Sequence, residues 1–432
     1  MATMDFWSAR QLQQLQLYDR VSCSSAVEPA RNAIIGRGLR FCHEAVFGNF
    51  TSALIGSLGE LTDPIGGQPL VIDWLGVRYE REVYCHMSYY RQRVAHALRV
   101  EVCDLLEWLR LRPSSHSLPL RLPLPLISEE YFEYVDVLES VVSFFARRPR
   151  RNRIGNSQRP YRIVEVGAGF GMWSLAAHAA LRQFASSRDA GHRVHASPHF
   201  EAHLVEADPL KIVTIKDTLA RNNISDATIY HAALAPPGHQ GQEVILGGHL
   251  GFYAVHSLPG AARSKFSTVV NSTDLLSLLL PLRSARADDM GLVDLLDVDV
   301  QGAEHTAFDE ATMDALDSQV LRVHIGTHGK GTKNKNAVRG TVPGTAGARY
   351  TGEFNESDAT PLLERLSTDH VYGPADGEKA IAQRFIQHGW RPRWLLGQNA
   401  GNCDHDDLFR VTPLGYVCMA DGALAFVNPR YS

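Results

Sequence analysis

Hydrophobic and polar positions follow two different periods along the chain, and the clearest change of period lies near its middle. Residues 163–166 form a short run rich in β-branched side chains, and residues 172–181 continue with Ala and Leu at helical spacing. Between the two stand Gly167, Gly169 and Gly171, which permit positive φ angles and a close approach between backbone and ligand. This order predicts a buried strand, a tight turn and a helix whose first N–H groups point into a nucleotide-binding crevice.

The pattern continues as an alternation of strands and helices. A helix is expected at 131–145, before the glycine turn, and strands or helices are expected after it at 203–208, 209–222, 227–234, 269–282, 292–298, 320–325, 381–389 and 390–396. Such alternation requires a parallel sheet with right-handed crossovers. Residues 415–419 and 423–427 flank Asp421-Gly422 and predict a closing hairpin. The expected fold is a doubly wound, mostly parallel, seven-stranded α/β sheet with an antiparallel C-terminal hairpin.

The first part of the chain has a different pattern. Residues 1–112 predict a mainly helical region with a short strand near 70–74, and the Pro- and Ser-rich segment 112–125 predicts an extended connector. We therefore expect one unit at 1–125 and a second at 126–432, with a mobile loop at about 330–357, where Gly, Thr, Lys and Asn predominate. The N-terminal region is expected to be a helical cap or an oligomerisation surface, with a substrate lid as the alternative.

Composition narrows the class of protein. The chain has 432 residues, a net charge of −4 and a pI near 6.5, so no global attraction to nucleic acid or an anionic membrane is expected. Its six cysteines are dispersed, which favours free thiols in a reducing compartment. The first 21 residues lack the apolar core of a signal peptide, and no membrane-spanning segment is evident. These features predict a soluble, cytoplasmic protein.

Two charged stretches have more ordinary explanations than a dedicated binding site. The arginine-rich run 147–153 fits a nuclear-import signal or a phosphate patch, although a solvated linker face is the commoner meaning. Four histidines between 192 and 203 have spacings that can collect a metal, but Pro198 breaks any helix that would align them. We expect no metal site there.

Carboxylates indicate which nucleotide-like ligand the glycine turn binds. Glu165 precedes the turn and suits a cationic or hydroxyl-rich ligand, while Glu206 ends the next strand, where such folds place the carboxylate that binds ribose hydroxyls. Met172 stands where the dinucleotide fingerprint requires its third glycine. This spacing favours S-adenosylmethionine (SAM) over NAD, with Glu165 toward the methionine ammonium group and the adenine near Ala232 and Ala233.

A second polar cluster follows the apolar run 292–298, at the edge of the sheet where parallel strands bind ligands. Asp299 is the first candidate for orienting SAM or an acceptor, and Glu304 is the second. His328, after the next strand, is the candidate base because a histidine can remove a proton near neutral pH. Alternatively, Asp299 and Glu304 chelate a divalent cation such as Mg²⁺; otherwise we expect no metal.

Several segments together resemble the FkbM-like class I SAM-dependent methyltransferases over about 126–432. The resemblance is carried by Glu165–Trp173, Val205–Asp208, Asp297–Glu304, Tyr131–Glu139, Val323–His328 and Asp421–Pro429. It implies methyl transfer from SAM to a hydroxyl of a sugar, polyketide or other small metabolite. The chain departs from the family at Gln301, where an acid is usual, and at Asp297, where lysine is common. A catalytically silent SAM-binding or scaffold protein is therefore the alternative, and a nicotinamide oxidoreductase is less favoured.

Overall fold

A computed structural model describes twelve parts of the chain. They are 70–73, 75–80, 83, 129–147, 159–188, 198–249, 252–257, 267–284, 291–300, 303–327, 376–396 and 422–431. Several predictions lie outside these residues: most of the N-terminal region, the loop at 330–357, His328, Gln301 and the first strand of the C-terminal hairpin.

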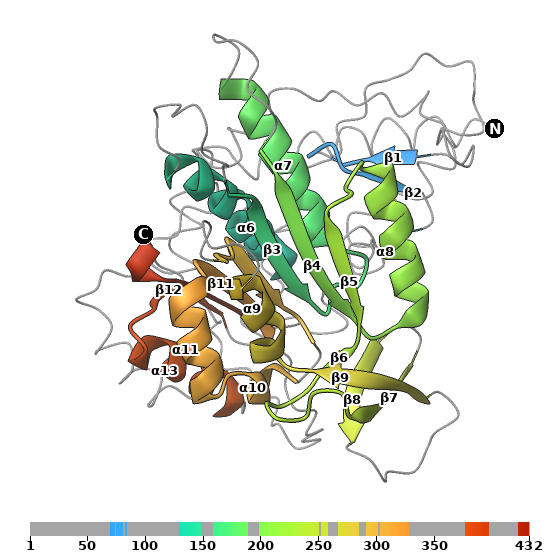
Figure 1. Cartoon of the computed structure of the whole chain (residues 1–432), viewed down its shortest axis with the longest axis vertical. Coiled ribbons are helices and arrows are strands. Elements are labelled where there is room, and N and C mark those ends of the chain that lie inside the picture. Colours follow the sequence, from blue (N-terminus) through green and yellow to red (C-terminus); the bar gives the residue numbers. More distant parts are fainter. Residues whose placement is uncertain are drawn as a thin grey trace, which may run out of the picture.

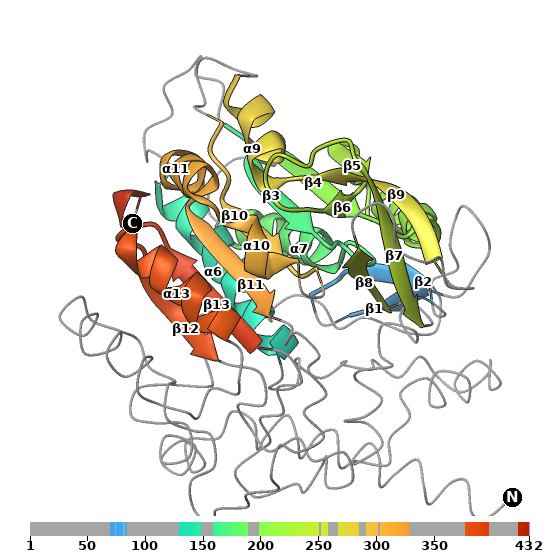
Figure 2. The ribbon, with the colours of Figure 1, turned by 90° about the horizontal axis from the view of Figure 1, so that it is seen from below.

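The centre of the fold is a seven-stranded sheet, which Figure 2 shows crossing the molecule. Its strands, in spatial order, are β12 (Arg391–Leu396), β13 (Gly422–Val427), β11 (Arg322–Thr327), β10 (Leu295–Val298), β3 (Tyr161–Val166), β4 (Phe200–Glu206) and β5 (Ala227–His231). The strands from β11 to β5 pair in parallel, and β13 is antiparallel to both of its neighbours. The doubly wound, mostly parallel sheet is therefore confirmed.

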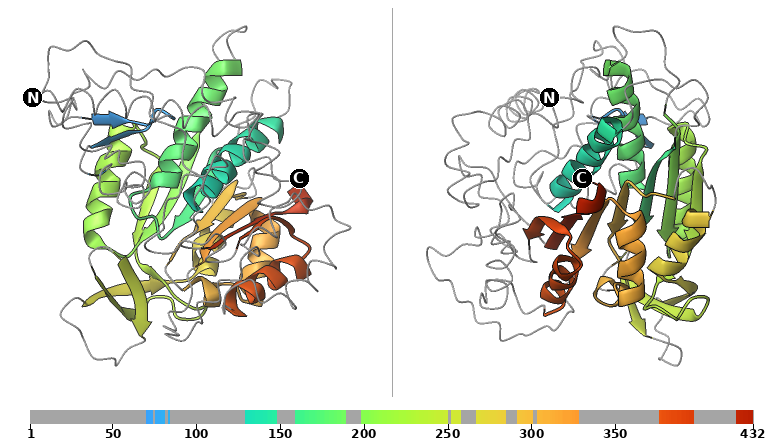
Figure 3. Two further views of the ribbon diagram at one scale, coloured as in Figure 1. Left: turned by 180° about the vertical axis from the view of Figure 1, so that it is seen from behind. Right: turned by 60° about the vertical axis from the view of Figure 1, so that its left-hand side comes forward.

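Helices cover both faces of this sheet (Figures 1 and 3). On one face lie α6 (Glu129–Arg147), α7 (Met172–Arg188) and α8 (Pro209–Arg221). On the other lie α9 (Leu275–Ser284), α11 (Glu310–Gln319) and α13 (Asp376–Gln387). Successive strand residues divide between the two cores, as period-two geometry requires: Ile163 and Leu295 pack toward α6, while Val164 and Leu296 pack toward α9 and α11. The short helices α10 (Glu304–Ala307) and η2 (Pro429–Tyr431) complete the set.

Local sequence explains where several helices begin. Asp208 caps α8 by accepting the N–H of Leu210 at 2.9 Å, and Pro209 occupies the first helical position. Asp309 caps α11 in the same way, through the N–H of Thr312 at 2.9 Å. The helices predicted at 131–145 and 209–222 are confirmed as α6 and α8.

The predicted strand at 227–234 is wrong in its extent. It ends at His231, and β6 (Ala233–Leu234) joins a separate four-stranded sheet with β9 (Ser267–Thr273), β7 (Glu243–His249) and β8 (Phe252–Ser257). The cause is a bend at Ala232, whose N–H lies 3.1 Å from the carbonyl oxygens of both Glu206 and Tyr230. Within 269–282, the helix start predicted at Ser272-Thr273-Asp274 is confirmed, because α9 begins at Leu275 and Asp274 Oδ1 accepts the N–H of Ser277 at 2.7 Å.

The C-terminal hairpin is wrong in its pairing. Both edges of β13 are occupied, by β11 on one side and by β12 on the other. The antiparallel closing pair is therefore β12 with β13, not two strands joined at Asp421-Gly422. A local turn signal predicts a neighbour in sequence, whereas burial of β13 on both faces selects two strands from farther away in the chain.

The N-terminal region contributes a small hairpin to the described structure. β1 (Leu70–Ile72), which confirms the strand expected near 70–74, pairs with β2 (Arg78–Glu80). Leu75, Val77 and Tyr79 are buried in the same core as α6 and α7. Among the described helices, none combines the length and the hydrophobicity that crossing a membrane requires.

Candidate functional site

The glycine turn after β3 adopts the predicted backbone conformation. Gly167, Gly169 and Gly171 have φ angles of 84°, 57° and 74°, which side chains disfavour. A Cβ atom at Gly167 would overlap the carbonyl oxygen of Asp299, and one at Gly171 would lie 3.1 Å from Leu204 Cδ2. These two glycines let the turn pack on β10 and β4. A Cβ at Gly169 would meet nothing closer than the Gly167 carbonyl oxygen, at 3.9 Å, so among the described residues no other strand or helix packs closely against the backbone at Gly169.

Glu206 ties this turn to the end of β4. Its Oε2 accepts the N–H of Gly169 at 2.7 Å, and its Oε1 accepts the N–H of Asp208 at 2.7 Å. The N–H of Ala232 donates to the Glu206 carbonyl oxygen at 3.1 Å. Burial raises the pKa of Glu206, and the charge of Lys211 opposes that rise. Three of the predicted cofactor-binding residues, Gly169, Glu206 and Ala232, are thus brought together.

Glu165 lies on the α6 face of β3 and is 1% exposed. Its carboxylate accepts the N–H groups of Trp173 and Ser174, at 3.2 and 2.9 Å, and the Ser174 hydroxyl at 2.5 Å. Glu165 therefore satisfies the first N–H groups of α7. Burial raises its pKa to about 7 against the lowering effect of these hydrogen bonds. Its predicted role at the methionine end of a ligand stays a prediction, because both oxygens bond to α7.

Asp299 lies where β3, β10 and β11 end. Its N–H donates to the carbonyl oxygen of Val166 at 2.8 Å, and a Cβ at Gly326 would lie 3.2 Å from its Cγ. Next to Gly326, the Thr327 hydroxyl donates to Oε1 of the buried Glu378 at 2.8 Å. Asp299 is therefore held close to the glycine turn, at the edge of the sheet that the sequence indicated.

The other predicted residues are placed differently. Glu304 is completely buried in α10, with Oε1 3.7 Å from Nε2 of His305, and Ala233 is buried in β6. His328 lies outside the described residues. The catalytic roles of Asp299, Glu304 and His328 stay predictions.

The structure also reveals a polar row on the α6 face of the sheet. Asp297 of β10 is in register with Glu165 of β3 and with His324 of β11, so the three side chains point to the same face. Burial raises the pKa of Asp297 well above its usual value, and the neighbouring carboxylates, Glu165 first, raise it further. A carboxylate in the middle of a central strand is unusual.

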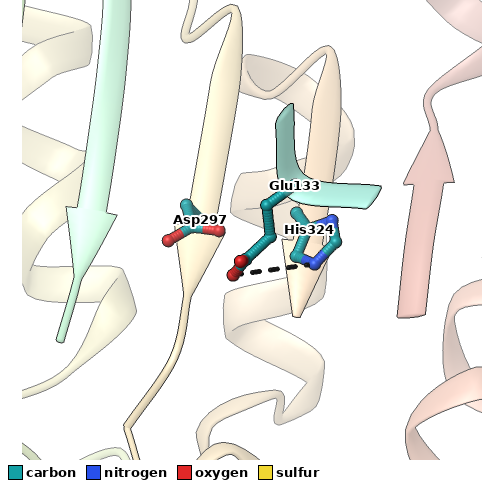
Figure 4. Close-up of side chains that lie close together, drawn as sticks. All are labelled: Glu133, Asp297 and His324. Carbon is teal, nitrogen blue, oxygen red and sulfur yellow. Dashed lines mark ion pairs between the residues drawn. The ribbon is translucent and has the colours of Figure 1, made fainter. Parts of the chain in front are cut away.

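α6 supplies partners to this row (Figure 4). Asp136 accepts from His324 Nδ1 at 2.7 Å and from Arg322 at 2.7 Å, and Glu133 Oε1 lies 3.9 Å from His324 Nε2. Burial alone would raise the pKa of Asp136, but the hydrogen bond from His324 and the charge of Arg322 lower it below its usual value. Sequence reasoning treated Asp297 only as a departure from a family. The feature of the sequence that could have indicated this row is the pair of acids, Glu133 and Asp136, on the inner face of an apolar helix.

Part of the basic run has a structural role. Arg147 and Arg159 both contact the buried Asp294, before β10, at 3.0 and 2.7 Å. Arg147 is therefore tied to the sheet, which differs from the solvated face expected for the run. The remaining arginines of 148–153 lie outside the described residues.

Comparisons with known proteins give only remote similarities. No family model matches the chain, and no curated protein does. Among solved structures, methyltransferase FkbM from Methylobacillus flagellatus is 13% identical with a TM-score of 0.26, covering 68% of this chain and 54% of its own. An O-methyltransferase family protein from Burkholderia thailandensis is 11% identical with a TM-score of 0.24, covering 69% of this chain and 59% of its own.

A third structure, cofactor-bound Rv0187 from MTB, is 12% identical with a TM-score of 0.24 and covers 68% of this chain and 89% of its own. The chain thus spans about half the length of the first of these structures, at 54%. Similarities this weak do not identify a family or a ligand for the chain.

Proposed function

We propose that this protein is a SAM-dependent methyltransferase that methylates a hydroxyl group of a small metabolite or sugar. The observation that supports this most directly is the hydrogen bond between the Gly169 N–H and Glu206, which joins the ends of β3 and β4. In doubly wound sheets, ligands bind at the carboxyl ends of the strands and a carboxylate at this position holds the ribose. The antiparallel β13 within the otherwise parallel sheet agrees with the methyltransferase resemblance of the sequence.

The residues fit the adenosyl part of SAM. Each Glu206 oxygen accepts one backbone N–H at 2.7 Å, and a carboxylate has about four acceptor positions, so acceptor capacity is left for ribose hydroxyls. Gly169 leaves room for the ligand beside the backbone. SAM, when bound, supplies a methyl group that its sulfonium already activates. The protein then has to hold the acceptor oxygen in line and remove its proton.

The position of Asp299 at the ends of β3, β10 and β11 supports a role in orienting the acceptor. Its backbone is fixed by Val166, and its side chain packs against Gly326 at the end of β11. We assign His328, one residue beyond the end of that strand, the role of base. Glu304, the second candidate, is completely buried in α10, so we assign it a positioning role rather than direct contact with the acceptor.

Calorimetry tests the cofactor. The full chain is expected to bind SAM and S-adenosylhomocysteine but not NAD. Glu206→Gln is expected to weaken SAM binding by about 10- to 100-fold, since hydrogen bonds to a charged group contribute about 1.5–3 kcal/mol. Asp217→Asn makes the same change of chemical type on an exposed position of α8 and should leave binding unchanged. If both variants bound SAM with the same affinity, Glu206 would not be the residue that binds the ribose hydroxyls.

A product search tests the reaction. Incubation of the protein with isotopically labelled SAM and a hydroxylated metabolite pool is expected to give O-methylated product, and Asp299→Asn should lower its yield at least tenfold while SAM still binds. Tight SAM binding with no labelled product from any pool would instead support the catalytically silent alternative. Unchanged turnover in both Asp299→Asn and His328→Ala would show that the acceptor assignments are wrong.

A further inference from the structure

Three side chains from three elements meet between α6 and the sheet, apart from the glycine turn. They are Glu133 of α6, Asp297 of β10 and His324 of β11, and Figure 4 shows them facing one another. One ligand atom of each lies within 4.8 Å of those of the other two, and Glu133 Oε1 is 3.9 Å from His324 Nε2. Two ligands bound at about 2.0–2.2 Å can stand about 4 Å apart across a metal ion, so small movements of these side chains would bring all three into range.

Asp297 gives the cluster its chemical character. Its side chain is 2% exposed and lies in register with Glu165 of β3 and His324 of β11, on the sheet face that Glu133 of α6 covers. A buried carboxylate without a partner is costly, whereas one that coordinates a metal is not. A metal ion bound among Glu133, Asp297 and His324 would satisfy the Asp297 carboxylate.

Asp136 prepares His324 for such a role. An ionised carboxylate only accepts hydrogen bonds, so the contact of 2.7 Å between Asp136 Oδ2 and His324 Nδ1 places the ring hydrogen on Nδ1. The Nε2 lone pair then faces Glu133, which at 3.9 Å is too distant for a hydrogen bond. Histidines that bind metals characteristically donate their other N–H to a carboxylate in this way.

We propose that Glu133, Asp297 and His324 bind one divalent transition-metal ion, of which Zn²⁺ is the best match, and that this ion holds α6 against β10 and β11. One imidazole and two carboxylates are ligands that Zn²⁺ accepts, whereas Mg²⁺ and Ca²⁺ prefer oxygen ligands alone. Two ionised carboxylates balance the charge of a divalent ion, and a neutral imidazole adds none. The site is distinct from the Asp299 and Glu304 pair considered from the sequence, and it does not depend on SAM binding.

Metal analysis of the full chain tests this site. Protein produced with zinc in the medium and purified without chelators is expected to contain about one Zn²⁺ per chain by mass spectrometry. Asp297→Asn and His324→Gln should each lower that content to below a tenth. Asp136→Asn keeps all three ligands but alters the residue that orients His324 and pairs with Arg322, and it should weaken Zn²⁺ binding by about 10- to 100-fold.

A second cluster offers a matched control. Glu310, Asp314 and His388 also place ligand atoms within 4.8 Å of one another, but they lie at the surface, with the two acids exposed. His388→Gln should leave the zinc content at about one per chain. Zinc that disappears in His388→Gln and persists in Asp297→Asn would overturn the proposal, because the ion would then be bound at the surface.

One measurement avoids variants that fail to fold. In crystals of the unaltered protein, anomalous scattering at the zinc absorption edge should give a peak between Glu133, Asp297 and His324. A map without that peak, from protein crystallised with Zn²⁺ present, would overturn the proposal.

Discussion

The two faces of the central sheet are built by different means from the same strands. Toward α9, α11 and α13, β10 and β11 present Leu296, Val298, Val323 and Ile325, which join a continuous apolar core. Toward α6 the alternate positions carry Asp297 and other charged groups. The apolar face depends on shape and burial, which many sequences provide. The charged face depends on specific partners, and the loss of any one leaves another buried and unsatisfied.

The largest expected effect comes from breaking the charged face at Arg322. This residue contacts Asp136 at 2.7 Å and Glu139 at 2.9 Å and is 8% exposed. Arg322→Met should lower the free energy of unfolding by about 3–5 kcal/mol, because it leaves the buried carboxylate of Asp136 without its arginine. Chemical denaturation measures the change.

Arg182→Met provides the control, since Arg182 is exposed on α7. It should change stability by no more than about 0.5 kcal/mol. If both arginine variants lowered the free energy of unfolding by the same small amount, the charged face would not depend on its specific partners.

The second prediction concerns the pH dependence of the charged face. Burial raises the pKa of Glu165 from its usual 4.5 to about 7, so between these values the folded protein binds more protons than the unfolded chain. Stability contributed by this group is therefore unaffected below pH 4.5 and falls as the pH rises to about 7, by on the order of 3 kcal/mol. Glu165→Gln should remove that decline, and denaturation of both proteins from pH 4 to 8 measures it.

Glu201 supplies a contrast of opposite sign for the same experiment. Its hydrogen bond with His203, followed by those from Arg162, lowers the pKa of Glu201 to about 2 despite partial burial. Its stabilising contribution is present above pH 4.5 and is lost as the pH falls toward 2. Glu201→Gln should thus change only the acid side of the profile. The prediction for Glu165 would be contradicted if the free energies of unfolding of Glu165→Gln and of the unaltered protein differed by the same amount at every pH.

A smaller effect is expected on the apolar face. Ile325 is fully buried in β11, and Ile325→Val removes one methylene group without exposing a polar atom. The free energy of unfolding should fall by about 0.5–1.5 kcal/mol. The same loss should be found at pH 5 and pH 8, in contrast to Glu165→Gln. A strong pH dependence would mean that the two faces are coupled.

The difference between the faces also explains how much the sequence revealed. Periodicity predicted β3, β10 and α6 well, because the spacing of apolar residues distinguishes a strand from a helix. The glycine turn and Glu206 were found because their spacing is local, and the structure places Gly169 and Glu206 in contact. The cluster around Asp297 was not found, since Glu133 and His324 lie far from it in sequence and nothing local indicates that the three come together.

The errors in the fold have a similar origin. The split at Ala232 depends on a bend that no glycine or proline marks. The four-stranded sheet pairs β6 with β9, although β7 and β8 lie between them in the chain. The placement of β13 between β11 and β12 was not predicted, because Asp421-Gly422 indicated a hairpin with the preceding residues instead. In each case a non-local contact outweighed a local preference.

The smallest effect should come from a charged contact at the rim of the apolar face. Nδ1 of His388 lies 2.9 Å from Asp317 Oδ2, and Asp317 Oδ1 also accepts Trp390 Nε1–H at 2.6 Å. Partial burial alone would lower the pKa of His388, but the hydrogen bond and charge of Asp317, with Glu310, raise it above its usual 6.5.

The contribution of this contact is therefore complete below pH 6.5 and is lost as the pH rises through the higher pKa of the folded protein. His388→Gln should lower stability by less than about 1 kcal/mol at pH 5.5, because solvent screens the pair, and by less still at pH 9. Denaturation at the two pH values checks this. An effect as large as that of Arg322→Met would show that charge pairs on both faces matter equally, and that burial does not separate them.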